Sequence, residues 1–125
     1  MAAATPLRRG LGRASRLKQA RDFVRLRGAG QRTANGCLIA NWLPLPGGTR
    51  SRLGVVVSKK VGGSVVRSRA KRLLREAFRL HQHELTQPVD LVLVARQSIV
   101  GDGFADVERD FLATLRRIGL LKTAE

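Results

Sequence analysis

Residues 59–79 read KKVGGSVVRSRAKRLLREAFR and contain most of the longest helical pattern in the sequence. At about 100° per residue, the apolar side chains of a helix predicted over about residues 65–84 gather on one side. They are Val66, Ala70, Leu73, Leu74, Ala77 and Leu80. Basic residues form a row on the opposite side: Arg67, Lys71, Arg72, Arg75 and Arg79. Arg69 and Glu76 lie beyond this row. One side is therefore suited to pack on a sheet, and the other to face solvent.

The basic row indicates a polyanionic partner. Like charges four residues apart destabilise an isolated helix by about 0.2–0.5 kcal/mol per pair, so a row without interspersed acids needs a reason. Guanidinium groups pair with phosphate oxygens, and the release of counterions drives such binding. Lys59 and Lys60 add charge before the helix, and the Gly62-Gly63-Ser64 break leaves backbone amides open to an anion. A solvated face with no partner is the alternative reading of this row.

The charge of the whole chain has the same bias. Its 125 residues carry 24 Lys plus Arg against 9 Asp plus Glu, a net charge of +15. Residues 1–79 hold 19 basic and 2 acidic residues, whereas residues 80–125 hold 5 basic and 7 acidic ones. A compact state with so much like charge repels itself, which favours a nucleic acid as partner.

The remaining pattern predicts a single α+β domain. Its elements are a helix over 16–27, strands over 36–43 and 52–58, the helix over 65–84, a strand over 89–95, and a helix from about 102 to Gly119. The short gap between the first two strands suits a hairpin, and the apolar run at 89–95 suits the interior of a sheet. The domain is expected over residues 15–121, between a disordered basic tail at 1–14 and a short tail at 122–125.

Few residues suggest catalysis or metal binding. Cys37 is the only cysteine and lies in an apolar run, so we expect a buried strand residue. His81 and His83 are two apart and face different directions, which suggests surface or helix-capping roles. Asp106 and Asp110 are one helical turn apart, which suggests a solvated helix face. We therefore expect no catalytic residue and no metal ligand in this chain. No apolar run is long enough to span a membrane.

Residues 59–79 also resemble the signature helix of the bacterial ribonuclease P protein family. The matching motifs are Lys59-Lys60-Val61-Gly62, Val65-Val66-Arg67-Ser68-Arg69 and Lys71-Arg72-Leu73-Leu74-Arg75-Glu76. Gly63 and Ser68 stand where the family has asparagine. The resemblance extends over roughly residues 15–120. It includes Arg16-Leu17-Lys18, Asp22-Phe23, Gly30, the strand Leu53 to Lys60 and the strand Asp90 to Arg96.

The resemblance implies a fold of about four strands and three helices, similar to the second domain of ribosomal protein S5, with a left-handed β-α-β crossover. It implies that the protein binds the catalytic RNA of ribonuclease P and assists removal of the 5′ leader from precursor tRNA. The RNA-binding residues would be Lys59, Lys60, Arg67, Ser68, Arg69, Lys71, Arg72, Arg75 and Arg79.

It also implies a cleft between the first helix and the sheet that holds the single-stranded leader. The cleft residues would be Phe23, Arg25, Arg27 and Trp42, with core packing as the alternative for both aromatics. Magnesium would be bound mainly by the RNA, which carries the chemistry. The protein would be an accessory subunit, monomeric in a 1:1 ribonucleoprotein in the bacterial cytoplasm.

Other functions remain open from the residues alone. A ribosomal or ribosome-assembly protein would share the basic charge, and its co-purifying RNA would distinguish it. A stand-alone nuclease would need clustered carboxylates or histidines, which the sequence does not show. A DNA-binding helix motif is disfavoured by the strands and by the lack of a helix-turn-helix pair.

Overall fold

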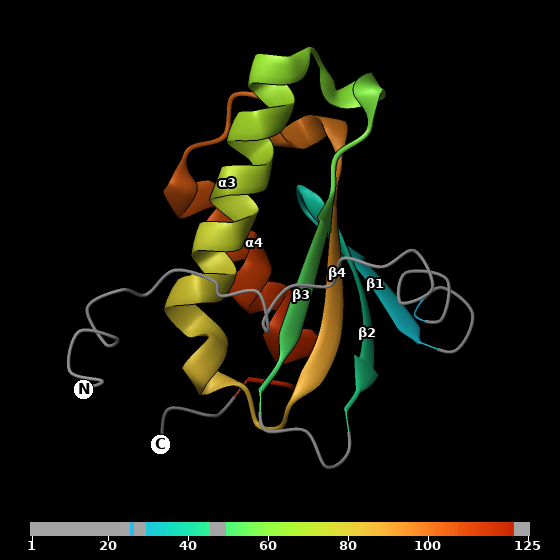
Figure 1. The fold of residues 1–125 in the computed structure, drawn as a ribbon. Helices are drawn as coiled ribbons and strands as arrows, with labels where there is room; N and C mark the ends of the chain where they lie inside the picture. Colours follow the sequence, from blue (N-terminus) through green and yellow to red (C-terminus); the bar gives the residue numbers. More distant parts are fainter. Residues whose placement is uncertain (1–25, 27–29, 46–49, 122–125) are drawn as a thin grey trace, which may run out of the picture.

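The computed structural model describes residues 26, 30–45 and 50–121, which form a β-sheet with two α-helices on one of its faces (Figure 1). The strands are β1 (Gln31–Asn35), β2 (Leu38–Pro44), β3 (Arg52–Val56) and β4 (Val89–Ala95). The helices are α3 (Ser64–His81) and α4 (Phe104–Arg117). Short 3₁₀ helices lie at Lys59–Val61, Gln82–Glu84 and Gln97–Ile99.

The strand order is β1-β2-β4-β3, and it corrects the predicted hairpin between the second and third of these strands. β2 pairs antiparallel with β1 on one side and with β4 on the other. β3 pairs with β4 in parallel. The hairpin was wrong because β4 is apolar on both faces, so it takes the interior position that separates β2 from β3. The prediction that residues 89–95 lie inside the sheet is confirmed.

β1 was missed because its sequence, QRTAN, is polar. The strand lies at the sheet edge, and its residues alternate between exposed and half-buried. A strand with one free edge and partly solvated faces needs no apolar alternation, so the sequence pattern contains no signal for it. Gly36, with φ +58°, begins the tight turn that joins β1 to β2.

The two described helices agree closely with their predictions. α3 ends at His81 and continues as a 3₁₀ turn to Glu84, so the predicted segment 65–84 is helical throughout. α4 begins after Gly103, and Gly119, at which the predicted helix ends, has the positive φ of +78° that is common just after a helix. The first predicted helix, 16–27, lies outside the described residues except for Leu26, which is helical. The count of three helices and the tails at 1–14 and 122–125 stay predictions.

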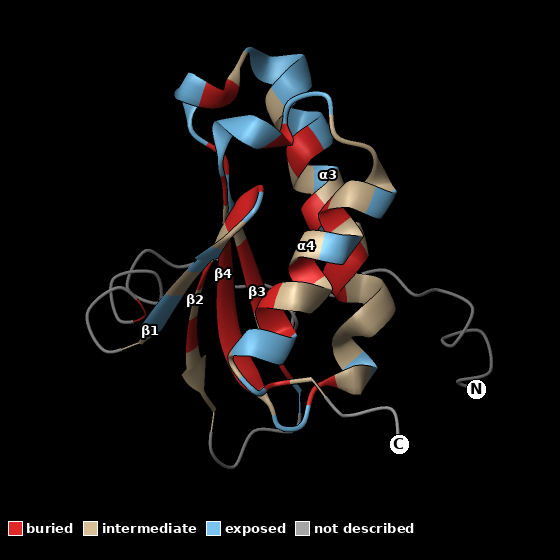
Figure 2. Ribbon diagram, turned by 180° about the vertical axis from the view of Figure 1, so that it is seen from behind, coloured by how far each residue is buried: buried red, intermediate tan, exposed pale blue. Residues whose placement is uncertain are grey.

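The core lies between the sheet and the two helices, as the buried residues in Figure 2 show. α3 contributes Ala70, Leu74, Ala77 and Phe78, which are at most 3% exposed. Phe78 was absent from the predicted apolar side, and Val66 is 36% exposed rather than buried. The buried stripe therefore begins at Ala70, one turn later than predicted, and includes Phe78. The basic residues keep the solvent side.

A smaller apolar cluster lies on the other face of the sheet. Leu26 and Val92 form its buried part, and Leu43 and Val94 pack against it. Residues that alternate along β4 thus serve two separate clusters, which explains why this strand is apolar on both faces. β3, α3 and β4 form a β-α-β unit with parallel strands. The handedness of that crossover stays a prediction.

Candidate RNA interface

The basic residues of α3 and of the 3₁₀ turn before it all lie outside the buried stripe. We define the basic face by its members: Lys59, Lys60, Arg67, Ser68, Arg69, Lys71, Arg72, Arg75 and Arg79. Six of these are exposed, and Arg67, Lys71 and Arg79 are half-buried. The buried stripe of Ala70, Leu74 and Ala77 fixes the rotation of the helix and so fixes this face outward.

Two arginines of the basic face are anchored on backbone carbonyls. Nε of Arg67 donates to the carbonyl oxygen of Gly62 at 3.1 Å. Nη2 of Arg69 donates to the carbonyl oxygen of Asp102 at 2.8 Å, in the loop before α4. A guanidinium group has five N–H donors, so each anchored arginine keeps donors for a further acceptor. The hydrogen bond to Asp102 also shows that Arg69 points toward the loop before α4, so it lies outside the main basic row, as predicted.

Arg79 differs from the rest of the basic face because it is paired. Its Nε donates to Oε1 of Glu76 at 2.9 Å, and its Nη2 contacts the other carboxylate oxygen. This hydrogen bond holds the pKa of Glu76 below its ordinary value. The sequence placed Glu76 beyond the basic row, but the i,i+3 spacing brings it back to Arg79. The positive charge at Arg79 is therefore partly neutralised within the helix.

The start of α3 is open to an anion. Its N-cap is Gly63, which supplies no side-chain hydrogen bond, and the first turn contains no acidic residue. Lys59 and Lys60 are exposed just before it, and Val65 is 82% exposed. The side-chain amide of Gln97 donates to the carbonyl oxygen of Lys60 at 2.9 Å and so holds the turn in place. Free backbone N–H groups and two lysines form a positive end to the helix.

Only one of the four predicted leader residues, Trp42, lies among the described residues. Phe23, Arg25 and Arg27 lie outside the described residues. Trp42 is 7% exposed and belongs to the core cluster between the sheet and the helices. Its Nε1 has no hydrogen-bond partner among the described residues. Trp42 therefore does not share the sheet face with Leu26, and its packing supports the core role that the sequence left as the alternative.

An arginine that sequence reasoning missed lies on the face of the sheet away from α3 and α4. Arg52 and Asp90 are register partners on β3 and β4. Nε and Nη2 of Arg52 donate to the two carboxylate oxygens of Asp90 at 2.8 and 2.7 Å. Asp90 is fully buried, and the Arg52 side chain is 32% exposed. An aspartate inside an apolar run needs a cationic partner, and that signal was available in the sequence.

The acidic residues of α4 and the two histidines have more specific places than the sequence indicated. Asp106 accepts a hydrogen bond from the backbone N–H of Gly103 at 3.0 Å and so caps α4. Asp110 accepts one from the backbone N–H of Cys37 at 3.0 Å. The prediction of a solvated helix face is therefore wrong for Asp110, whose side chain is 14% exposed, but not for Asp106, whose side chain is 45% exposed. His83 is exposed, whereas His81 is half-buried between two carboxylates.

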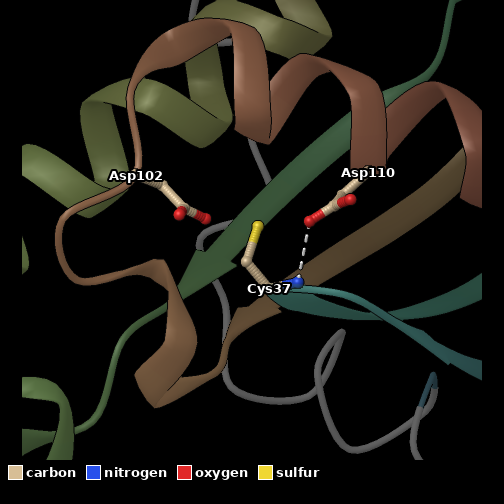
Figure 3. Close-up of side chains that lie close together, drawn as sticks. All are labelled: Cys37, Asp102 and Asp110. Carbon is tan, nitrogen blue, oxygen red and sulfur yellow. Dashed lines mark hydrogen bonds between the residues drawn. The ribbon is translucent and has the colours of Figure 1, made fainter.

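Cys37 is buried, as predicted, although it lies in the β1–β2 turn rather than inside a strand. Burial, a hydrogen bond with Asp110 and the nearby charges of Asp110 and Asp102 raise the pKa of its thiol to about 12. Figure 3 shows the thiol between the carboxylates of Asp102 and Asp110. Within the described residues, this is the one group of three potential metal ligands. No described helix is long and apolar enough to cross a membrane.

Sequence comparison identifies relatives along most of the chain. A sequence model of the family described as Ribonuclease P matches residues 11–119. The ribonuclease P protein component of Alkaliphilus oremlandii is 37% identical over 110 residues, which is 88% of this chain and 96% of the relative. That of Gluconacetobacter diazotrophicus is 38% identical over 109 residues, which is 86% of this chain and 94% of the relative.

Solved structures have the same fold. The RNase P protein of Staphylococcus aureus matches with a TM-score of 0.80 at 27% identity, covering 88% of this chain and 100% of that chain. The RNase P protein of Thermotoga maritima matches with a TM-score of 0.74 at 29% identity, covering 82% of this chain and 96% of that chain.

Proposed function

Because the chain belongs to the bacterial ribonuclease P protein family, we propose that it is the subunit that binds the catalytic RNA of ribonuclease P through its basic face. One observation supports this most directly: none of the eight cations of α3 and its preceding turn is buried, and five of them are exposed. Arg72 and Arg75 at the centre of this face are exposed, so they reach a partner without any rearrangement of the core.

The electrostatics favour a folded RNA over a small anion. The basic face runs along α3 from the 3₁₀ turn at Lys59 to Arg79, and a helix rises about 1.5 Å per residue. A row of that length spans several phosphates of one backbone. Each neutralised phosphate releases counterions, so the binding should weaken steeply with salt. The uncapped start of α3 adds backbone donors at one end of the row.

The second proposed contact is with the 5′ leader of precursor tRNA, on the sheet face that carries Leu26 and Val92. Family resemblance supplies Phe23, Arg25 and Arg27 as leader residues. The described part of this face supports a single-stranded ligand because it combines an apolar cluster with Arg52, whose partner Asp90 is in register with Leu43 of that cluster. Stacking and cationic contacts are the two means by which proteins hold single-stranded nucleic acids. Trp42 is not part of this proposal, since it packs on the opposite face.

The proposed reaction is the magnesium-dependent endonucleolytic cleavage that gives tRNA its mature 5′ end. Bound magnesium ions would activate water and stabilise charge on the phosphate, and we assign them mainly to the RNA. The described residues do not suit magnesium, because their one group of three potential ligands includes a thiol. The protein is then an accessory subunit that screens phosphate repulsion. We place it as a monomer in a 1:1 complex in the bacterial cytoplasm.

The test is cleavage of precursor tRNA at low magnesium. It compares the protein alone, a bacterial ribonuclease P RNA alone, and their mixture. We expect only the mixture to cleave well, and an Arg67→Ala, Arg69→Ala, Arg75→Ala variant to lose the gain. A matched control with Arg96, Arg116 and Arg117 changed to alanine removes the same charge from exposed positions outside α3.

Three outcomes would overturn the proposal. Cleavage by the protein alone would reveal an active site in the chain itself. Equal loss in the triple variant and its matched control would mean that total charge matters rather than the basic face. A mixture no better than RNA alone, with ribosomal RNA co-purifying, would favour a ribosomal role.

A further inference from the structure

Three side chains from separate parts of the fold converge beside the turn between β1 and β2 (Figure 3). Cys37 comes from that turn, Asp102 from the loop before α4, and Asp110 from α4 itself. The sulfur and one oxygen of each carboxylate all lie within 4.8 Å of one another. The basic face does not include these residues, so the cluster needs an account of its own.

The backbone holds the three groups in place without help from an ion. The Asp110 carboxylate accepts the backbone N–H of Cys37 at 3.0 Å. Gly36 makes room for it, since a Cβ there would lie 2.2 Å from a carboxylate oxygen of Asp110. The backbone of Asp102 is fixed at both ends: its N–H donates to Ile99 at 3.0 Å, and its carbonyl accepts Arg69 at 2.8 Å. Hydrogen bonds therefore hold the Asp110 carboxylate and the backbone that carries Cys37 and Asp102.

The cluster has the composition of a cation site. Cys37 is 1% exposed, and its polar thiol is aimed into the space between the two carboxylates. Arg109 reaches Asp110 at 3.4 Å and Asp106 at 3.5 Å. No described residue forms an ion pair with the Asp102 carboxylate. Two acidic groups thus face a buried thiol from opposite sides, and their negative charge is only partly neutralised. A dication between them would supply the missing positive charge.

We propose that Cys37, Asp102 and Asp110 bind one zinc ion. A thiolate with carboxylates suits a borderline-soft dication, whereas magnesium prefers oxygen ligands alone. The thiol gives its proton to solvent on binding, and the sulfur and one oxygen from each aspartate occupy three positions. Asp102 and Asp110 are half-buried, so water reaches the fourth position. This site is separate from the magnesium of the proposed RNA-directed function.

Zinc in this position joins the β1–β2 turn to the start of α4. An ion that binds only the folded state stabilises it by RT ln(1 + c/Kd), where c is the free ion concentration, so the gain in stability grows with the logarithm of that concentration. The same loop holds Arg69 through the Asp102 carbonyl, so the ion also steadies one anchor of the basic face. Stability of the free protein is therefore the readout, and it needs no RNA.

The test uses the full-length, reduced protein, freed of metal with a chelator and titrated with Co²⁺ as a spectroscopic probe. Cys37 is the only cysteine of the chain, so any thiolate-to-cobalt charge-transfer band reports this residue. We expect that band together with the intense visible bands of tetrahedral Co²⁺, saturating at one ion per chain. Zinc should displace the cobalt and raise the Tm.

Variants separate the site from incidental binding. Cys37→Ser should abolish the charge-transfer band, and Asp102→Asn should weaken binding at least about tenfold and remove the zinc-dependent rise in Tm, because each loses a ligand. Asp106→Asn is the matched control: it removes the same charge between the two ligands, and its amide oxygen can still cap Gly103. The absence of the charge-transfer band in the folded wild type would overturn the proposal. Equal cobalt affinity in the wild type and Asp102→Asn would also overturn it.

Discussion

Nε2 of His81 lies 2.6 Å from Oε2 of Glu108, and this contact ties the last residue of α3 to α4. Nδ1 of the same ring lies 2.7 Å from Oε2 of Glu84. With a carboxylate at each nitrogen, this geometry favours the imidazolium form, in which both nitrogens donate. Partial burial lowers the pKa of His81, but the hydrogen bonds and charges of Glu108 and Glu84 outweigh it and raise the pKa above 6.5.

The first prediction is a pH-dependent stability that arises at His81. A group whose pKa is higher in the folded state stabilises the fold below its unfolded pKa, and this contribution disappears as the pH rises through the folded value. Wild type should therefore exceed His81→Gln in free energy of unfolding below pH 6.5, and the difference should shrink at higher pH. Urea unfolding across a pH series measures it. His83→Gln is the control, because that side chain is 67% exposed. Parallel curves for wild type and His81→Gln would contradict the prediction.

The second prediction concerns the ion pair of Arg52 and Asp90. Arg52→Ala should lower the free energy of unfolding by about 3 kcal/mol, since it removes the cation from a fully buried carboxylate. Asp90→Asn combined with Arg52→Met should cost less, because no buried charge then remains. Chemical denaturation of the three proteins gives the comparison. A double variant less stable than Arg52→Ala would show that another property of these side chains dominates.

The third prediction tests the space beside Gly36. Gly36→Ala should destabilise the fold for two reasons, a φ of +58° and a Cβ 2.2 Å from the Asp110 carboxylate. Gly101→Ala has only the backbone cost of about 1–2 kcal/mol, because its φ is +88° but nothing lies within 4 Å. Gly63→Ala has neither problem and should cost the least of the three, only the penalty of alanine as a poorer N-cap than glycine. The order of their Tm values is the measurement, and Gly101→Ala below Gly36→Ala would contradict it.

The fourth prediction separates two arginines of the basic face. Arg72 is exposed, whereas Arg79 is paired with Glu76. If each contacts one phosphate, Arg72→Ala should reduce the slope of log affinity against log salt by about 1. Arg79→Ala should reduce it less, because Glu76 already neutralises part of that charge. Binding to ribonuclease P RNA across a salt series measures both slopes. A larger loss for Arg79→Ala would mean that the pair opens on binding.

Sequence periodicity was sufficient for the parts of the fold that depend on local pattern. The repeat of apolar residues in α3 and the apolar run of β4 each predict their element within a few residues. Strand pairing could not be predicted in the same way. β2 and β3 are close in sequence, yet β4 lies between them, because hydrophobic burial on both faces of β4 outweighs proximity along the chain.

In the candidate site too, features that depend on local sequence could be predicted and contacts between distant segments could not. The outward direction of Arg72 and Arg75 follows from helical spacing, so it was predictable. Contacts between distant segments were not: Cys37 and Asp110 are 73 positions apart. Helical spacing alone suggested a solvated Asp110, and only the packing of α4 beside the β1–β2 turn shows its partner.

The position of β4 between β2 and β3 also affects how the chain folds while it is being synthesised. β3 pairs with β4 alone in the described sheet, and α3 lies between them in sequence. While the ribosome is still making the segment before Val89, β3 has no strand to join and the apolar side of α3 has no complete surface to cover it. A nascent chain paused there exposes both to chaperones and to any nearby nucleic acid. The sheet closes only when Ala95 has been released from the exit tunnel.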